Sequence, residues 1–496
     1  MSGKRVAKNT LFQIMKMLIT TIVNLYMVRI LLQELGVEGY GVFNLIAGVL
    51  ALMMFLNGAM TASSQRYLSY YCTKVLSERK RVFSTTKHLH LFVALLIASV
   101  LWIAQDFVFN SLINVPAGLL VSSHSLYQVM VIGVFASVLT VPFNAQINAY
   151  EDLGVDAFLS VVESVLKLAS AFIIGFVDNP LTALGVLFVS VSFLMLLVKA
   201  LYCTARYREC VLWSSTLDVA LLKEMVGFTS WNSFGAVCGV ARVQGLAIVL
   251  NNFFGVTINA VYAIAMQVNG KLKEFSINIM KAINPKIVKA ESNGQRSEML
   301  NLSMQASRFS LLLYSVIALP IYFEAKFILS LWLGEYPQEA VPFVKLFLIL
   351  SLVNLTTIGL QTAIQAIGDV KAYQSTIGSV LLLTIPFAYA VLTLGYPAYS
   401  VIVVSIVMEV VSCLMRFVFL RKKAGLSIKR YVFFVLTKAL QVITPTCVVL
   451  FVFTSSYEPS YLRVISSGFI SFGVIVGLTY WLVLSTEEKN LIRLKV

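Results

Sequence analysis

Charged side chains inside long apolar runs are the residues of this sequence that could do chemistry. An ionisable group at bilayer depth is costly, so each one is a candidate for a functional site. The deepest cations are Arg29 and Arg242, which have no obvious partner in their own runs. Arginine makes planar, bidentate contacts with phosphate oxygens, so this pair predicts an anion-binding cavity. Lys16 and Arg66 lie closer to the ends of their runs, and we place them at the inner mouth of the cavity.

The orientation of Lys16 and Arg29 has two interpretations. At 3.6 residues per turn, their spacing brings them within about 60° of each other on one helix. They then form a cationic stripe facing a cavity, which is the interpretation we favour. In the alternative, Lys16 snorkels to the inner surface and Arg29 to the outer surface. Snorkelling is a sufficient explanation for four lysines near the ends of runs: Lys199, Lys326, Lys345 and Lys438.

Two pairs of opposite charges also lie within apolar runs. Glu163 and Lys167 are four residues apart, so they share a helix face and can neutralise each other. Glu409 and Arg416 are seven residues apart and also share a face, but either can pair with another helix instead. We interpret these four residues as ion-coupling groups or as structural charges, and both alternatives stay open.

Motifs for enzymatic chemistry are absent from the sequence. It contains no GxxxxGK[ST], GxSxG or HExxH, and its loops offer no convincing pair of catalytic carboxylates. The three histidines and six cysteines show no metal-binding spacing. We therefore predict a protein that is not an enzyme and has neither a cofactor nor a metal site.

The composition predicts an integral membrane protein. Of the 496 residues, 59% are hydrophobic and only 12% are charged, whereas about a quarter are charged in soluble proteins. The apolar runs are continuous rather than alternating, which favours helices of about 20 residues over barrel strands. We expect an all-α protein with about fourteen transmembrane helices, near 9–33, 41–63, 88–110, 125–149, 156–177, 181–203, 224–253, 257–280, 306–333, 341–367, 372–394, 398–420, 431–455 and 463–484.

Loop charge gives the expected orientation. Basic residues gather in alternate loops, and the opposite loops contain only Arg463, which predicts that both termini are cytoplasmic. The net charge of +15 is scattered between apolar runs instead of forming one basic domain. This distribution suits loops that face anionic membrane lipids and argues against nucleic-acid binding. The first run extends through Leu32 without a cleavage site, so we expect an uncleaved first helix.

The sequence contains an internal repeat. The stretch LGVEGYGVFNL at 35–45 is echoed 219 residues later by FGVTINAVYAI at 254–264. A second echo, at a spacing of 217, places residues 144–152 on residues 361–369. Two echoes at matching spacing indicate a duplication. We expect six-helix bundles at 1–210 and 211–425, followed by two additional helices and a cytoplasmic tail at 426–496.

The stretch at 35–45, its repeat, and the six-plus-six-plus-two arrangement of spans together resemble the MOP exporter superfamily. This superfamily includes the MATE antiporters, the lipid II flippase and the Wzx-type polysaccharide flippases. The first stretch is similar to the LGxxxYGxFxL element of the polysaccharide branch. The resemblance implies a flippase for an undecaprenyl-diphosphate-linked oligosaccharide in the bacterial cytoplasmic (inner) membrane. It also implies transport by alternating access and a role beside glycosyltransferases and a polymerase in O-antigen, capsule or exopolysaccharide synthesis.

Two other functions remain as alternatives. A cation-coupled multidrug or metabolite antiporter of the same fold would need carboxylates in the cavity, and Glu163 and Glu409 are the deep candidates. A membrane glycosyltransferase would need catalytic acids in a sizeable loop, and the loops of this chain are short and basic. The charge of the expected cavity favours the flippase, because a diphosphate is an anion.

Overall fold

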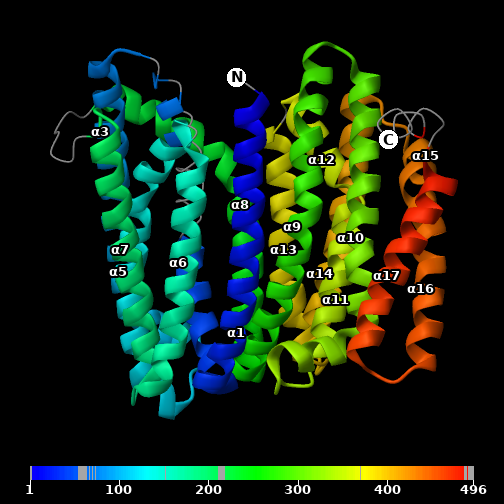
Figure 1. The fold of residues 1–496 in the computed structure, drawn as a ribbon, viewed down its shortest axis with the longest axis horizontal. Helices are drawn as coiled ribbons and strands as arrows, with labels where there is room; N and C mark the ends of the chain where they lie inside the picture. The colour runs from blue at the N-terminus through cyan, green and yellow to red at the C-terminus, as the bar shows by residue number, and fades with distance from the viewer. Residues whose placement is uncertain are drawn as a thin grey trace. The chain divides into compact units, whose positions relative to one another are not determined.

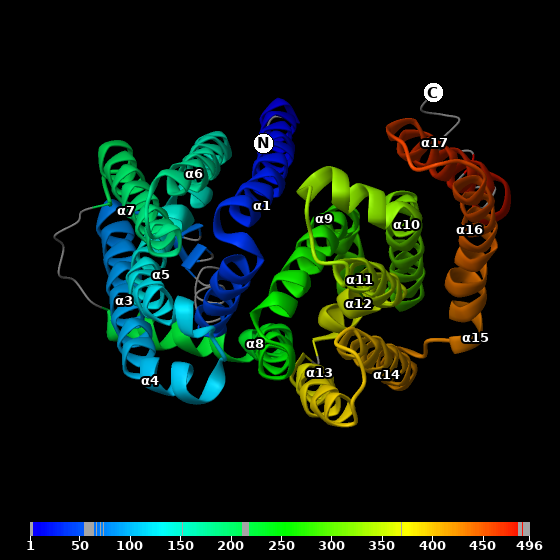
Figure 2. The same ribbon diagram turned by 90° about the horizontal axis from the view of Figure 1, so that it is seen from below.

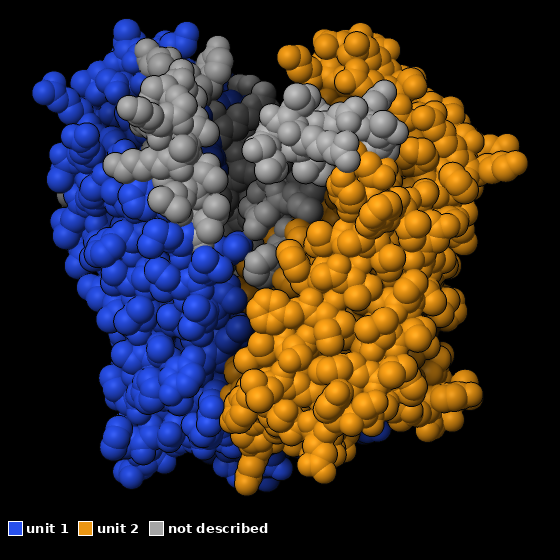
Figure 3. Space-filling view, turned by 45° about the vertical axis from the view of Figure 1, so that its right-hand side comes forward, with its two compact units in different colours: residues 1–260 blue, residues 261–496 orange. Residues whose placement is uncertain are grey.

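The computed structural model describes residues 3–53, 64–65, 67–69, 71–72, 74–150, 152–210, 218–368, 370–484 and 489. The regular secondary structure in these ranges is helical, with no strand among them (Figure 1), so the predicted all-α membrane class is confirmed. The chain divides into two compact units, unit 1 at residues 1–260 and unit 2 at residues 261–496, coloured blue and orange in Figure 3. The predicted bundle boundary between residues 210 and 211 concerns the repeat and stays a prediction.

Unit 1 is built around α5, which packs against α3 and α7, while α1 packs against α6 and α8 (Figure 2). Its core includes Phe83, Leu126, Tyr127 and Ile147, all of them fully buried. Its helices are α1 (Gly3–Met53), α3 (Leu76–Ile103), α4 (Gln105–Phe107), α5 (Leu120–Ala149), α6 (Leu153–Ile173), α7 (Pro180–Arg206) and α8 (Val219–Phe254), with short segments η1 (Val108–Leu112), η2 (Ala117–Leu119) and η3 (Ile174–Phe176).

Unit 2 is built around α10, which packs against α11, α12, α16 and α17. Its buried residues include Phe343, Leu420 and Tyr431. Its helices are α9 (Val256–Ser292, with residues 256–260 in unit 1), α10 (Arg296–Leu333), α11 (Ala340–Leu355), α12 (Ile358–Ile367), α13 (Val370–Thr393), α14 (Ser400–Ala424), α15 (Ile428–Tyr431), α16 (Lys438–Ser456) and α17 (Tyr461–Leu478), with η4 (Val432–Thr437) and η5 (Thr479–Val483).

The two copies of the first echo share an unusual backbone conformation. Gly36 kinks α1 with φ 68° and ψ 173°, and Gly255 separates α8 from α9 with φ 75° and ψ −170°. Only glycine adopts this region readily, because other residues carry a Cβ atom that clashes there. A Cβ atom on Gly41 would lie 2.0 Å from the carbonyl oxygen of Val256, so the helix after the first kink packs directly on the second copy of the echo.

The second echo extends to whole helices. A shift of 217 residues carries α6 onto α13 and α7 onto α14, and it carries α5 onto α11 and α12 together. The copies differ in one respect. Helix α5 is continuous through Pro142, whereas α11 and α12 are separate and bent by 41° at Thr356 and Thr357.

The number of candidate spans is lower than the fourteen expected. The described residues contain eleven helices that are long and apolar enough to cross a membrane, or twelve if the bent pair α11–α12 is one span. One reason is that the first candidate, Met15–Ala51, joins two predicted spans across the kink at Gly36. Another is that α9 does not qualify, since its first half contains Asn259, Gln267 and Lys271.

Candidate functional site

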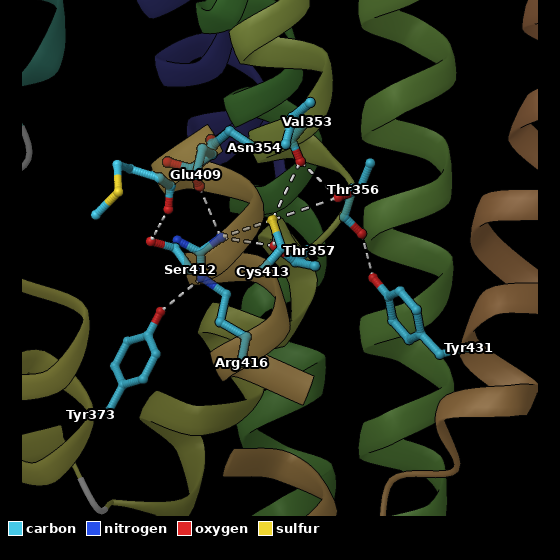
Figure 4. Close-up of polar contacts among 11 residues, drawn as sticks. Val353, Asn354, Thr356, Thr357, Tyr373, Glu409, Ser412, Cys413, Arg416 and Tyr431 are labelled. Carbon is cyan, nitrogen blue, oxygen red and sulfur yellow. Dashed lines mark hydrogen bonds and ion pairs between the residues drawn. The ribbon is translucent and has the colours of Figure 1, made fainter. Parts of the chain in front are cut away.

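Unit 2 contains a buried ion pair at the break between α11 and α12 (Figure 4). Arg416 on α14 is only 3% exposed. Its Nη1 donates to Glu409 Oε1 at 3.0 Å and to Thr357 Oγ1 at 2.8 Å. Its Nε donates to the hydroxyl of Tyr373 at 3.2 Å. Glu409 and Arg416 therefore pair with each other, which was one of the two arrangements expected from their spacing.

Neighbouring helices complete this network. Asn354 Nδ2 donates to Glu409 Oε1 at 2.8 Å, and the Cys413 thiol lies 3.2 Å from Thr357 Oγ1. The break leaves the carbonyl of Thr356 without a helical partner, and the hydroxyl of Tyr431 donates to it. A buried ion pair offsets the cost of desolvation only when further hydrogen bonds satisfy its atoms. The network meets this condition and joins four helices, α11, α13, α14 and α15, to the break before α12.

Unit 1 has a buried cation at the equivalent position of the repeat. The shift of 217 places Lys199 of α7 on Arg416, Asp156 of α6 on Tyr373, and Thr140 of α5 on Thr357. Lys199 is 4% exposed. The snorkelling expected for this lysine is therefore wrong, because its side chain is enclosed between helices instead of reaching a surface.

The surroundings of Lys199 differ from those of Arg416. Ser192 stands where unit 2 has Glu409, so α7 supplies no carboxylate. Lys199 interacts electrostatically with Asp156 and Glu163 of α6, but within the described part of the chain no ion pair holds it. The cation is therefore buried next to carboxylates that are bonded to other lysines.

Those other lysines are Lys16 and Lys167. Lys16 Nζ lies 2.7 Å from Asp156 Oδ2, and Lys167 Nζ lies 2.7 Å from Glu163 Oε1. We call Lys16, Asp156, Glu163, Lys167 and Lys199 the cationic cluster, since its three lysines and two carboxylates give a net charge of +1. Lys16 is 27% exposed and Lys167 is 29% exposed, so the cluster is open at its edge. An anion can bind by displacing a carboxylate from a lysine.

The predicted arginines also lie in unit 1. Arg29 is on α1 before the kink, and Arg242 is on α8, so a single unit contributes both. The two helices pack closely: a Cβ atom on Gly48 of α1 would lie 2.4 Å from Gln244 Oε1 of α8. Both arginines are partly exposed. Arg66, the remaining predicted cation, lies outside the described residues.

Sequence reasoning missed Asp156 and the burial of Lys199. The signal that could have found both is the second echo, because its spacing aligns Lys199 with Arg416 and Asp156 with Tyr373. Among the residues that the structure describes, no group of three or more His, Cys, Asp or Glu side chains is placed to hold a metal ion.

Comparison with known proteins shows which solved structures have a similar fold. No family model matches the chain, and no curated protein matches it. Among solved structures, the lipid II flippase MurJ in an inward closed conformation has a TM-score of 0.73 at 12% identity, covering 98% of this chain and 100% of the flippase. An inward-facing multidrug resistance MATE transporter of the MOP superfamily has a TM-score of 0.70 at 15% identity, covering 82% of this chain and 94% of the transporter.

A third structure is a MOP-superfamily transporter from Pyrococcus furiosus, described as having a binding pocket of reverse polarity. It has a TM-score of 0.64 at 13% identity, and the alignment covers 85% of this chain and 96% of that transporter. At such identities the likeness concerns the fold. The chain has the all-helical fold of MOP-superfamily transporters.

Proposed function

We propose that this protein flips an undecaprenyl-diphosphate-linked oligosaccharide from the cytoplasmic to the outer leaflet of the bacterial cytoplasmic membrane by alternating access. The observation that carries the proposal is the cationic cluster of unit 1, in which a buried lysine lies beside two occupied ion pairs. A diphosphate is the complementary ligand, because it brings about two negative charges. Moving these charges out of a negative cytoplasm is favoured by roughly 4–5 kcal/mol per 100 mV.

The proposed binding site joins the predicted arginines to this cluster. Arg29 and Arg242 hold the diphosphate oxygens bidentately, and Lys16 and Arg66 attract it at the inner mouth. Lys199 adds a positive charge that no carboxylate among the described residues neutralises in an ion pair. The lipid tail stays in the bilayer, while the protein replaces the water around phosphate and sugar.

Two similarities support a lipid-linked cargo. The lipid II flippase structure matches nearly the whole chain, whereas the MATE transporter matches 82% of it. The stretch at 35–45 resembles the element of polysaccharide flippases. Under this proposal, glycosyltransferases supply the lipid-linked substrate and a polymerase consumes it, so genes for both enzymes should lie beside the gene for this protein.

Complementation of a deletion strain tests the site. We expect Arg29→Ala and Arg242→Ala to abolish surface glycan and to accumulate lipid-linked repeat units at normal protein level. Lys423→Ala is the matched control, since this exposed cation lies at the end of α14 and should leave surface glycan unchanged. Normal surface glycan in both arginine variants would show that Arg29 and Arg242 do not form the binding site.

A second candidate is a cation-coupled multidrug or metabolite antiporter. It is favoured by carboxylates buried within candidate spans, above all Glu409, and by the MATE structures with this fold. Drug efflux that persists in a strain lacking all lipid-linked glycan, and that is lost in Glu409→Gln, would support the antiporter. Normal drug sensitivity in the deletion strain would argue against the multidrug form of this candidate.

A further inference from the structure

Unit 2 contains a pocket that the proposed diphosphate site does not use. It has a volume of about 710 Å³ and is formed by α10, the segment between α10 and α11, and the chain around the start of α17. It lies toward the C-terminal end of α10. At the other end of that helix, Arg296 donates to the carbonyl of Lys423 in the basic end of α14. By the charge of the loops, the pocket is on the outer side of the membrane.

Two residues that line this pocket, Glu324 and Arg463, form a buried charge pair with unused hydrogen-bonding capacity. Glu324 is 1% exposed, and its Oε2 accepts from Arg463 Nη2 at 2.6 Å. Its other oxygen, Oε1, has no hydrogen-bond partner among the described residues, and neither does Arg463 Nε. Buried polar atoms in folded proteins are nearly always hydrogen-bonded to protein groups or to ordered water, so this acceptor and this donor can each take a hydroxyl group as a partner.

The chemistry of the two free atoms identifies the kind of group that fits. A hydroxyl both donates and accepts a hydrogen bond, so hydroxyl groups can satisfy Glu324 Oε1 and Arg463 Nε together. Glu324 repels an anionic ligand, and Arg463 repels a cationic one. Phe327 and Tyr336 also line the pocket and offer apolar ring surface for the C–H face of a sugar.

We propose that this pocket binds a neutral sugar residue. Both sides of the pocket are fixed before binding: Arg463 Nη1 donates to the carbonyl of Thr454 at 3.0 Å, and the Tyr336 hydroxyl donates to the carbonyl of Lys326 at 3.0 Å. The sugar can be free or can belong to a lipid-linked oligosaccharide. The second case deepens the proposed function, whereas sugar binding itself rests on Glu324 and Arg463 and on no residue of the cationic cluster.

The test is a titration of the purified full-length chain in a detergent without a sugar headgroup, monitored by saturation-transfer NMR. The probes are the methyl glycosides of glucose and N-acetylglucosamine and, separately, polyprenyl-diphosphate-linked N-acetylglucosamine. Saturable binding of a methyl glycoside shows that the sugar alone is sufficient. Binding of the lipid-linked probe alone, if lost on blocking the pocket, assigns the sugar to lipid-linked cargo. No saturable binding of any probe would overturn the proposal.

Two substitutions of α10 make the test specific to the pocket. Ser330→Trp places a bulky side chain in the pocket and leaves both residues of the charge pair unsubstituted, and we expect at least about a tenfold loss of sugar affinity. The matched control is Leu331→Trp, because Leu331 is 42% exposed and does not line the pocket. Equal sugar affinity in these two variants would contradict the proposal.

A substitution of the charge pair tests the role of the hydroxyl. Glu324→Gln preserves the shape and can still accept from Arg463, but it replaces the free acceptor with an amide donor, so sugar affinity should fall about tenfold. Arg29→Ala should leave sugar affinity unchanged. Sugar binding that survives Arg29→Ala and is lost in Ser330→Trp supports the pocket whatever happens to glycan export, so the two proposals can fail separately.

Discussion

The buried cations of the two units occupy equivalent positions of one repeat but have opposite surroundings. Arg416 is neutralised by Glu409 on its own helix and bonded to Thr357 and Tyr373. Lys199 has a serine in the place of that glutamate, and the carboxylates near it are bonded to other lysines. Both copies have a cation at this position, whereas Glu409 of α14 has a serine, Ser192, as its counterpart on α7. The comparison predicts a structural role for the pair in unit 2, and it is consistent with the ligand-binding role that we propose for the cluster in unit 1.

Matched substitutions of the two cations should separate these roles most strongly. Arg416→Met leaves Glu409 buried without its partner, which should cost about 3–5 kcal/mol of unfolding free energy. Lys199→Met removes a buried charge that no ion pair among the described residues holds, so the unfolding free energy should not fall, because an unpaired buried charge carries a desolvation cost. Detergent-induced unfolding in mixed micelles measures both values. Equal destabilisation by the two variants would contradict the proposal that Arg416 has a structural role and Lys199 does not.

Adding a carboxylate beside Lys199 should make its surroundings in unit 1 resemble those of Arg416 in unit 2. Ser192→Glu places a carboxylate at the position equivalent to Glu409 and neutralises Lys199. We expect glycan export to fall about tenfold, equivalent to about 1.4 kcal/mol, while Ser192→Gln, which carries no charge, should keep export. Surface glycan in the complemented deletion strain gives the measurement. Normal export in Ser192→Glu at normal protein level would show that the charge of Lys199 is not used.

Removing a carboxylate from the cationic cluster should increase the difference in charge between the two units. Asp156→Asn releases Lys16 and raises the net charge of the cationic cluster from +1 to +2. Binding of inorganic pyrophosphate to the purified protein should become about threefold tighter, because a partly exposed charge contributes under about 1 kcal/mol. Calorimetric titration against wild type measures this change. Weaker pyrophosphate binding in Asp156→Asn would mean that the carboxylate itself contacts the ligand or orders the site.

The smallest effect is expected at the exposed ion pair of α6. Glu163 and Lys167 are each 29% exposed, and pairs of this kind contribute about 0.2–1 kcal/mol. Glu163→Ala should therefore shift the unfolding free energy by no more than this, in contrast to Arg416→Met. A loss as large as that of the Arg416 variant would show that the Glu163–Lys167 pair has the same structural role as the pair in unit 2.

The sequence predicted those features that depend on local periodicity. Apolar runs identified the helices, and the spacings of four and seven residues correctly put Glu163 beside Lys167 and allowed Glu409 to bond Arg416. The break between the first two predicted spans is present as well, because two helices meet at the kink at Gly36.

Features that depend on packing between helices could not be predicted. Lys16 and Asp156 are 140 residues apart, and nothing local in either run indicates that α1 packs against α6. The position of Lys199 near the end of an apolar run can be read from the sequence and predicts snorkelling. The neighbouring helices that enclose its side chain cannot be read from the sequence. Arg463 was noted as an isolated basic residue of the outer loops, but its buried partner Glu324 lies 139 residues away.

Flipping in reconstituted vesicles tests the central claim most directly. Wild type, Lys199→Met and Lys423→Met would be compared in proteoliposomes that contain a fluorescent undecaprenyl-diphosphate-linked saccharide, with leaflet exposure read by quenching. We expect wild type and Lys423→Met to flip the lipid at equal rates and Lys199→Met to be at least about tenfold slower at unchanged stability. Equal rates in all three proteins would contradict a role for the buried cation of unit 1 in binding the diphosphate.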